Sequence, residues 1–254
     1  MAFGPDNRFN TKQGYMPQAD AALAHVDVGL REHMLKVYNY MASGLALTGI
    51  VAYAAGNSPA VMSLLYATNA AGQLAPTMLA WIVMLAPIGL VFFLSARIHA
   101  MQASTAQTVF WVYSALMGLS LANIFLVFTG ASIARVFFIT SATFGAMSLY
   151  GYTTKRDLSG FGSFLFMGLI GVVIASVVNI FLQSAAMQFV ISIVGVLVFV
   201  GLTAYDTQEI KSLYLESDST ETTGKKALMG ALKLYLDFIN IFIMLLQLFG
   251  QRRD

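Results

Sequence analysis

The chain has 254 residues, of which 58% are hydrophobic and 10% are charged, whereas ordinary globular chains are about 45–50% apolar and about 25% charged. The polar surface is too small to cover a soluble protein of this size. The net charge of +2, with basic residues at the ends of apolar runs, excludes a nucleic-acid-binding patch. The lack of cysteine excludes disulfides, thiolate metal sites and a cysteine nucleophile.

Residues 1–36 are polar, and we interpret them as a flexible cytoplasmic tail with a short interfacial helix near residues 26–36. No short apolar core with a small-residue cleavage site precedes the first apolar run, so a signal peptide is not expected. His25 and His33 belong to this tail and are expected to be solvated. The three scattered histidines of the chain make no metal site.

Seven apolar runs follow, each close to the length of about 20 residues that a transmembrane helix needs. They predict an all-α, polytopic domain over residues 37–254 with seven transmembrane helices, embedded in the lipid bilayer. The runs are 37–55, 77–98, 106–128, 131–152, 161–183, 187–209 and 228–249.

Lysine and arginine set the expected orientation. The tail is basic, whereas the loop at 56–76 has neither residue type. Because cytoplasmic loops carry the excess of basic residues, we expect the amino terminus in the cytoplasm. Along the chain, loops with basic residues alternate with loops without them, and only Arg135, near the outer end of the fourth run, interrupts this alternation. The last inner loop contains Lys211, Lys225 and Lys226.

The seventh run is less regular than the others. With Lys233 at the inner interface, its apolar part has about 17 residues, the lower limit for crossing. Arg252 and Arg253 would then lie outside, against the positive-inside rule. We predict that the run crosses the membrane, with a re-entrant hairpin as the alternative.

Small residues four positions apart predict close contacts between helices, since packing drives helix association in lipid. The pairs are Ser141 with Gly145 and Gly171 with Ala175.

The seventh run also carries a stripe of small and polar residues. Their 3-4-3-4-3 spacing keeps them on one helical face, which we predict to look into the bundle. Phe238, Ile241, Phe242 and Leu245 are expected elsewhere. The stripe consists of Gly230, Lys233, Asp237, Asn240, Met244 and Gln247.

Two aspartates, Asp206 and Asp237, interrupt the last two runs. A charged residue at the centre of a spanning helix costs about 2.5–3.5 kcal/mol on insertion scales, so it usually has a task. From the rise per residue, both lie about 5–6 Å inside the inner boundary and can face each other. Two nearby carboxylates in a low dielectric share a proton. Arg97, at the inner end of the second run, is the candidate cation for this pair.

A simpler interpretation stays open. Asp237 could pair with Lys233 one helical turn away, and Asp206 could reach Lys211. Arg97 would then serve only as an interfacial anchor.

Three longer motifs resemble the bacterial branch of the Bax inhibitor family (transmembrane Bax inhibitor motif). They are GYTTKRDLSGFGSFLFMGLIGVVIASVVNIFL at 151–182, VGLTAYDTQEIK at 200–211 and MGALKLYLDFINIFIMLLQLFG at 229–250. The resemblance extends from about residue 37 to the end. It implies a seven-helix fold with the last helix central, a bacterial inner-membrane location, and a pH-dependent calcium leak controlled by a di-aspartyl sensor on the cytoplasmic side. No enzymatic activity is implied.

The resemblance also implies roles for single residues. Asp206 in AYD and Asp237 in YLDFIN fall on the family's aspartate pair. Arg97 corresponds to the arginine that latches onto the pair, although the loop after it differs in length. Some relatives carry a glutamate where this chain has Ala86 and Pro87.

Calcium prefers six to eight oxygen ligands, so Asp206 and Asp237 would make a weak, transient calcium site rather than a storage site. Calcium would be a permeant ion, and no resident cofactor is expected. The ion path or the surroundings of the pair would include Asn240, Gln247, Lys233 and Tyr205.

Two alternative functions remain. Bacterial relatives are also linked to the regulation of membrane-anchored proteases, which would need a partner but no conduction. An intramembrane aspartyl protease is the remote alternative, because Tyr205 and Asp206 match half of its signature. That chemistry uses an aspartate flanked by glycine, whereas Leu236 and Phe238 flank Asp237.

Overall fold

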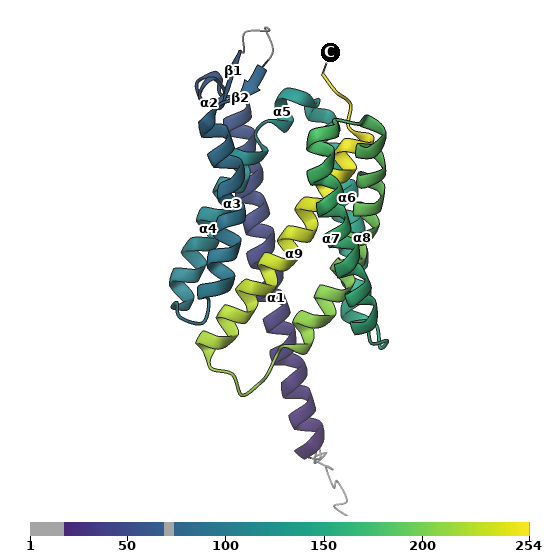
Figure 1. The fold of residues 1–254 in the computed structure, drawn as a ribbon. Coiled ribbons are helices and arrows are strands. Elements are labelled where there is room, and N and C mark those ends of the chain that lie inside the picture. Colours follow the sequence, from purple (N-terminus) through teal and green to yellow (C-terminus); the bar gives the residue numbers. More distant parts are fainter. Residues whose placement is uncertain (1–17, 69–73, 254) are drawn as a thin grey trace, which may run out of the picture.

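The computed structural model describes residues 18–68 and 74–253, with side chains described for residues 28–68 and 75–253 (Figure 1). Nearly all of this chain is helical. In chain order the elements are α1 (Gln18–Gly56), α2 (Pro59–Leu65), β1 (Tyr66–Thr68), β2 (Leu74–Pro76), α3 (Met78–Arg97), α4 (Ala103–Leu121), α5 (Ile124–Val127), α6 (Gly130–Thr153), α7 (Ser159–Leu182), α8 (Ala185–Ser212) and α9 (Thr220–Phe249).

The predicted all-α membrane fold is confirmed. Six spans are long and apolar enough to cross a membrane: α3, α4 with α5, α6, α7, α8 and α9. The bent pair of α1 and α2, which meet at 90°, makes a seventh if it is counted as one span. The strands β1 and β2 form a small antiparallel hairpin at one end of the bundle.

The first helix is longer than predicted. Helix α1 has 39 residues and begins at Gln18, so no break separates a tail ending at residue 36 from the first span. The interfacial helix predicted near 26–36 is the first part of α1, and this end projects beyond the other helices (Figure 1). Residues 1–17 of the predicted tail lie outside the described residues.

Helix α9 is the centre of the bundle, as predicted. In its apolar stretch 72% of the residues are buried, against 17–39% in the other five spans. It packs against α8, α1, α6 and α4. Figure 1 shows it running diagonally between a group formed by α1, α3 and α4 and a group formed by α6, α7 and α8. Helices α3 and α7 lie at the periphery, packed mainly on α4 and α8 respectively.

The seventh run crosses the bundle instead of turning back. Helix α9 is one unbroken element of 30 residues. The segment after it is tied to the connection between α5 and α6: the amide of Arg253 donates to the carbonyl oxygen of Val127 at 2.9 Å, and the amide of Thr129 donates to that of Gln251 at 3.0 Å. A re-entrant hairpin would have returned residues 251–253 to the end of the bundle where α9 begins.

The predicted contacts at small residues are wrong for both glycines. A Cβ atom added to Gly145 or Gly171 would meet no atom within 4 Å. Close approach occurs at other glycines, because spacing alone does not show which helical face meets a neighbour. A Cβ on Gly151 of α6 would collide with the carbonyl oxygen of Ala204 of α8, and one on Gly118 of α4 would lie 2.7 Å from the carbonyl oxygen of Thr48 of α1.

Candidate functional site

The polar stripe of α9 faces α8. At one end Gly230 lies against Ile210, and further along Met244 lies over Gly195. At the far end the side-chain oxygen of Gln247 accepts a hydrogen bond of 2.9 Å from the hydroxyl of Ser192 and another from the side-chain amide of Gln188. We call this contact between α8 and α9 the α8–α9 seam.

The apolar residues expected on the other faces of α9 are buried as well as the stripe. Helix α9 is surrounded by other helices, so Phe238, Ile241, Phe242 and Leu245 are buried too. Within the stripe, Gly230 and Asp237 are buried, Asn240 and Met244 are half-buried, and Lys233 and Gln247 are exposed.

The structure brings Asp206 and Asp237 together in the α8–α9 seam. Asp206 is 6% exposed and Asp237 is 4% exposed, and their carboxyl groups are close enough to influence each other's charge. Among the described residues, no hydrogen-bond partner reaches Oδ2 of Asp237, which is buried. A buried charged oxygen without a partner is costly. The neutral, protonated form of Asp237 suits this environment better than the carboxylate.

Lys233 is the cation next to the pair. Its Nζ lies 3.2 Å from Oδ1 of Asp206 and also contacts Oε2 of Glu209, one turn further along α8. The ammonium group lies 6.0 Å from the ring centroid of Tyr205. One positive charge therefore faces three carboxyl groups from two helices. Glu209 was missed in the sequence, where it looked like an ordinary residue near the inner interface.

The ion pairs of the simpler interpretation are not formed. Lys233 pairs across the seam with Asp206, not along its own helix with Asp237. Lys211 donates instead to the carbonyl oxygen of Tyr152 at 2.9 Å. Arg97 is exposed at the end of α3, which packs mainly on α4, and within the described residues it forms no ion pair. The structure does not bring Arg97 to the acid pair.

The remaining predicted residues are less close to the acid pair. Asn240 donates to the carbonyl oxygen of Leu236 in its own helix at 2.8 Å. Gln247 lies ten residues beyond Asp237, which is about 15 Å along the helix. Tyr205 packs its ring over Gly162 of α7. In the part of the chain that the structure describes, no group of three or more acidic, histidine or cysteine side chains is placed to hold a metal ion.

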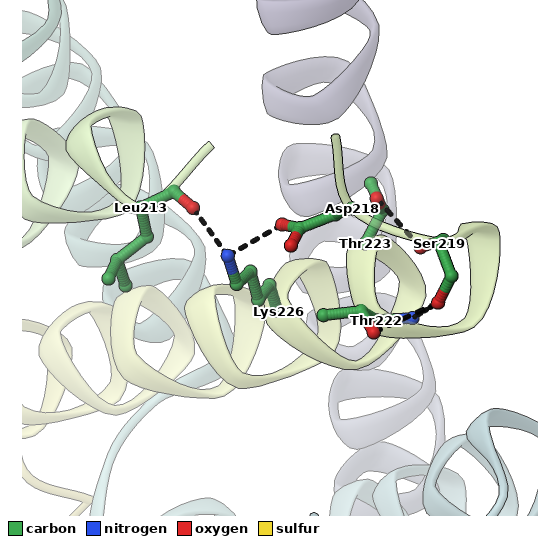
Figure 2. Close-up of polar contacts among 6 residues, drawn as sticks. All are labelled: Leu213, Asp218, Ser219, Thr222, Thr223 and Lys226. Carbon is green, nitrogen blue, oxygen red and sulfur yellow. Dashed lines mark hydrogen bonds and ion pairs between the residues drawn. The ribbon is translucent and has the colours of Figure 1, made fainter. Parts of the chain in front are cut away.

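The loop between α8 and α9 is held by several contacts with the start of α9. Figure 2 shows the ammonium group of Lys226 between the carbonyl oxygen of Leu213, at 2.9 Å, and Oδ2 of Asp218, at 2.6 Å. The hydroxyl oxygen of Ser219 caps α9 by accepting from the amide of Thr222 at 3.2 Å. These contacts fix the point at which α9 begins.

His33 lies against this loop and is not solvated, contrary to the expectation. It is 3% exposed, and its ring centroid lies 5.7 Å from that of Tyr214. The physical reason is that α1 extends past the apolar region and the loop folds against it. The side chain of His25 lies outside the described residues.

Comparisons with known proteins agree with the fold. The sequence model of a family described as "Inhibitor of apoptosis-promoting Bax1" matches residues 30–254. The inner membrane protein YbhL of Escherichia coli (strain K12) is 49% identical over 239 residues, which cover 93% of this chain and 98% of YbhL. Protein RP147 of Rickettsia prowazekii is 48% identical over 228 residues, covering 90% of this chain and 93% of the relative. A protein of Caulobacter vibrioides is 44% identical over 249 residues, which cover 98% of this chain and 100% of that relative.

Proposed function

The chain belongs to the Bax inhibitor family, and from this premise we propose that it is a bacterial inner-membrane protein through which calcium leaks in a pH-dependent manner. The observation that carries the proposal is the burial of both Asp206 and Asp237 in the α8–α9 seam. Charging both carboxyl groups there is costly, because they lie side by side away from water.

The pH response follows from the arrangement of charges. Lys233 neutralises Asp206, and the shared proton resides on Asp237. As pH rises this proton leaves, and two adjacent carboxylates repel each other across the seam. The repulsion favours separation of α8 from α9. Lys233, instead of Arg97, is then the cation next to the aspartate pair. When α8 and α9 are in contact, the side chain of Met244 packs on Gly195 and fills the space beyond the two aspartates.

Calcium fits the chemistry of an open seam. Two carboxylates offer the oxygen ligands that calcium prefers, but too few of them for tight binding, which suits passage rather than storage. Calcium would be the permeant ion and not a resident cofactor. Intramembrane proteolysis is not proposed, because Asp206 forms an ion pair with Lys233 and bulky residues flank Asp237.

Reconstituted liposomes test the proposal directly. Liposomes that contain only this protein should take up calcium faster than protein-free liposomes. The rate should rise by about tenfold from about pH 5 to pH 8, as expected if this change in pH shifts the equilibrium between the closed and the open seam by about 1.4 kcal/mol. A calcium-sensitive dye enclosed in the liposomes measures the rate. If folded protein gave no flux above the protein-free control at any pH, conduction would be excluded, and regulation of a membrane-anchored protease would be the better hypothesis.

The proposed orientation places the loop between α8 and α9 in the cytoplasm. Because the natural chain has no cysteine, single cysteines can report the side. Ser63→Cys, at the end with the hairpin, should react with a membrane-impermeant maleimide in intact cells. Leu215→Cys, which is also exposed, should react only after lysis. The reverse pattern would invert the orientation.

A further inference from the structure

Two cavities follow one another between α1 and α6. The first, of about 490 Å³, is lined by residues 31–38 of α1 and 144–152 of α6. The second, of about 560 Å³, is lined mainly by residues 45–53 of α1 and 130–138 of α6, with Phe238 and Phe242 of α9 among its walls. Phe144 and Phe238 meet between them, with ring centroids 5.6 Å apart. The two cavities are therefore neighbours along the bundle, and we call them together the α1–α6 groove.

The groove has open space at its glycines and opens toward the membrane. A Cβ atom added to Gly49, Gly130 or Gly145 would meet no atom within 4 Å, although all three line the groove. Apolar side chains at its rim, including Leu149 and Phe138, are exposed. Because this part of the protein lies among membrane spans, the medium that faces the groove is lipid.

One end of the groove is basic. Arg31 is the charged side chain in the lining of the first cavity, and among the described residues no carboxylate pairs with it. Its neighbour Glu32 lines cavities on other faces of α1. Arg31 precedes the apolar run that begins at residue 37 by six positions, or about 9 Å. Its backbone therefore lies outside the hydrocarbon core, from where the long side chain can reach back to the lipid headgroups.

We propose that the α1–α6 groove binds one anionic phospholipid, with the headgroup phosphate at Arg31 and an acyl chain running past Gly145 to Gly49. The dimensions agree. One leaflet contributes about half of a hydrocarbon core of about 30 Å. Gly49 lies 11 positions after Tyr38, which corresponds to about 16 Å of helix. Basic sites between membrane helices bind anionic headgroups in this way, and an arginine near the surface contributes about fivefold to such binding.

Native mass spectrometry of the full chain in a non-ionic detergent tests the proposal, with phosphatidylglycerol or zwitterionic phosphatidylcholine as the added lipid. The wild type should bind one phosphatidylglycerol about fivefold more tightly than phosphatidylcholine. Arg31→Gln should remove this preference, whereas Arg97→Gln, at an exposed arginine outside the groove, should keep it. Gly145→Leu and Gly49→Leu should each lose the tightly bound lipid, whereas Gly171→Leu, at an open glycine on α7, should keep it.

Three results would overturn the proposal: equal binding of the two lipids by the wild type, the same behaviour of Arg31→Gln and Arg97→Gln, or retention of the tight lipid in both groove-filling variants. Far-ultraviolet circular dichroism shows whether each variant is folded. Because the two groove-filling substitutions lie in different helices and both enter open space, the failure of one to fold leaves the other as the test.

Discussion

Asparagine in place of either Asp206 or Asp237 is expected to remove most of the pH dependence of calcium flux between about pH 5 and pH 8. The substitution keeps the shape of the side chain but removes one of the two charges that repel each other in the α8–α9 seam. Flux should stay near the low-pH rate of the wild type and change by less than about twofold over a range in which the wild type changes about tenfold.

The double variant should behave like either single variant, because the two carboxyl groups act as one unit. Glu221→Gln is the matched control: it removes an acid from the same helix, but one that pairs with Lys225 outside the seam. It should keep the wild-type profile. If both single variants also kept that profile, the coupled pair would be disproved, whatever the absolute flux.

Lys233→Met should destabilise the protein by about 2 kcal/mol at pH 8. Removal of one partner of a buried ion pair costs about 3–5 kcal/mol, and the expected loss is smaller here because the Lys233 side chain is 45% exposed and water screens its ammonium group. Asp206 would be left nearly buried beside Glu209 without a cation. The loss should shrink as the pH falls, because protonation of Asp206 would remove the unpaired charge.

Thermal unfolding in detergent, followed by circular dichroism, measures this effect. Lys225→Met provides the control, because its ion pair with Glu221 is 3.0 Å long but Glu221 is 56% exposed, so the pair should contribute only about 0–1 kcal/mol. Equal losses of stability in the two variants at pH 8 would show that the ion pair of Lys233 stabilises the protein no more than the ion pair of Lys225 does.

The spans could be predicted because their signal is local, and the two aspartates could be singled out as a candidate site for the same reason. A run of about 20 apolar residues has few other stable forms than a membrane helix, and an aspartate inside such a run marks a site wherever its partner lies. The central place of α9 came from the resemblance to a family. Composition alone does not distinguish it, since α7 and α8 have higher mean hydropathy than α9 but are far less buried.

Contacts between helices were predicted poorly, because they depend on rotation and register that the sequence does not encode locally. Lys233 and Asp237 are one turn apart and looked like natural partners, but the seam offers Lys233 two acids on α8 instead. Arg97 does not reach the acid pair for the same reason, since α3, which carries it, packs at the edge of the bundle. Gly145 has the spacing of a packing residue but faces a groove.

The attachments at the two ends of α9 limit how it can move. At its start, Lys226 ties it to the loop after α8; at its finish, residues 251–253 are bonded to the chain around Thr129. A helix attached at both ends cannot shift along its axis, but it can bend, and its sideways displacement is then largest near the middle of its length. Asp237 occupies that middle, 17 residues after Thr220 and 12 before Phe249. The acid pair therefore lies where the smallest force produces the largest sideways displacement.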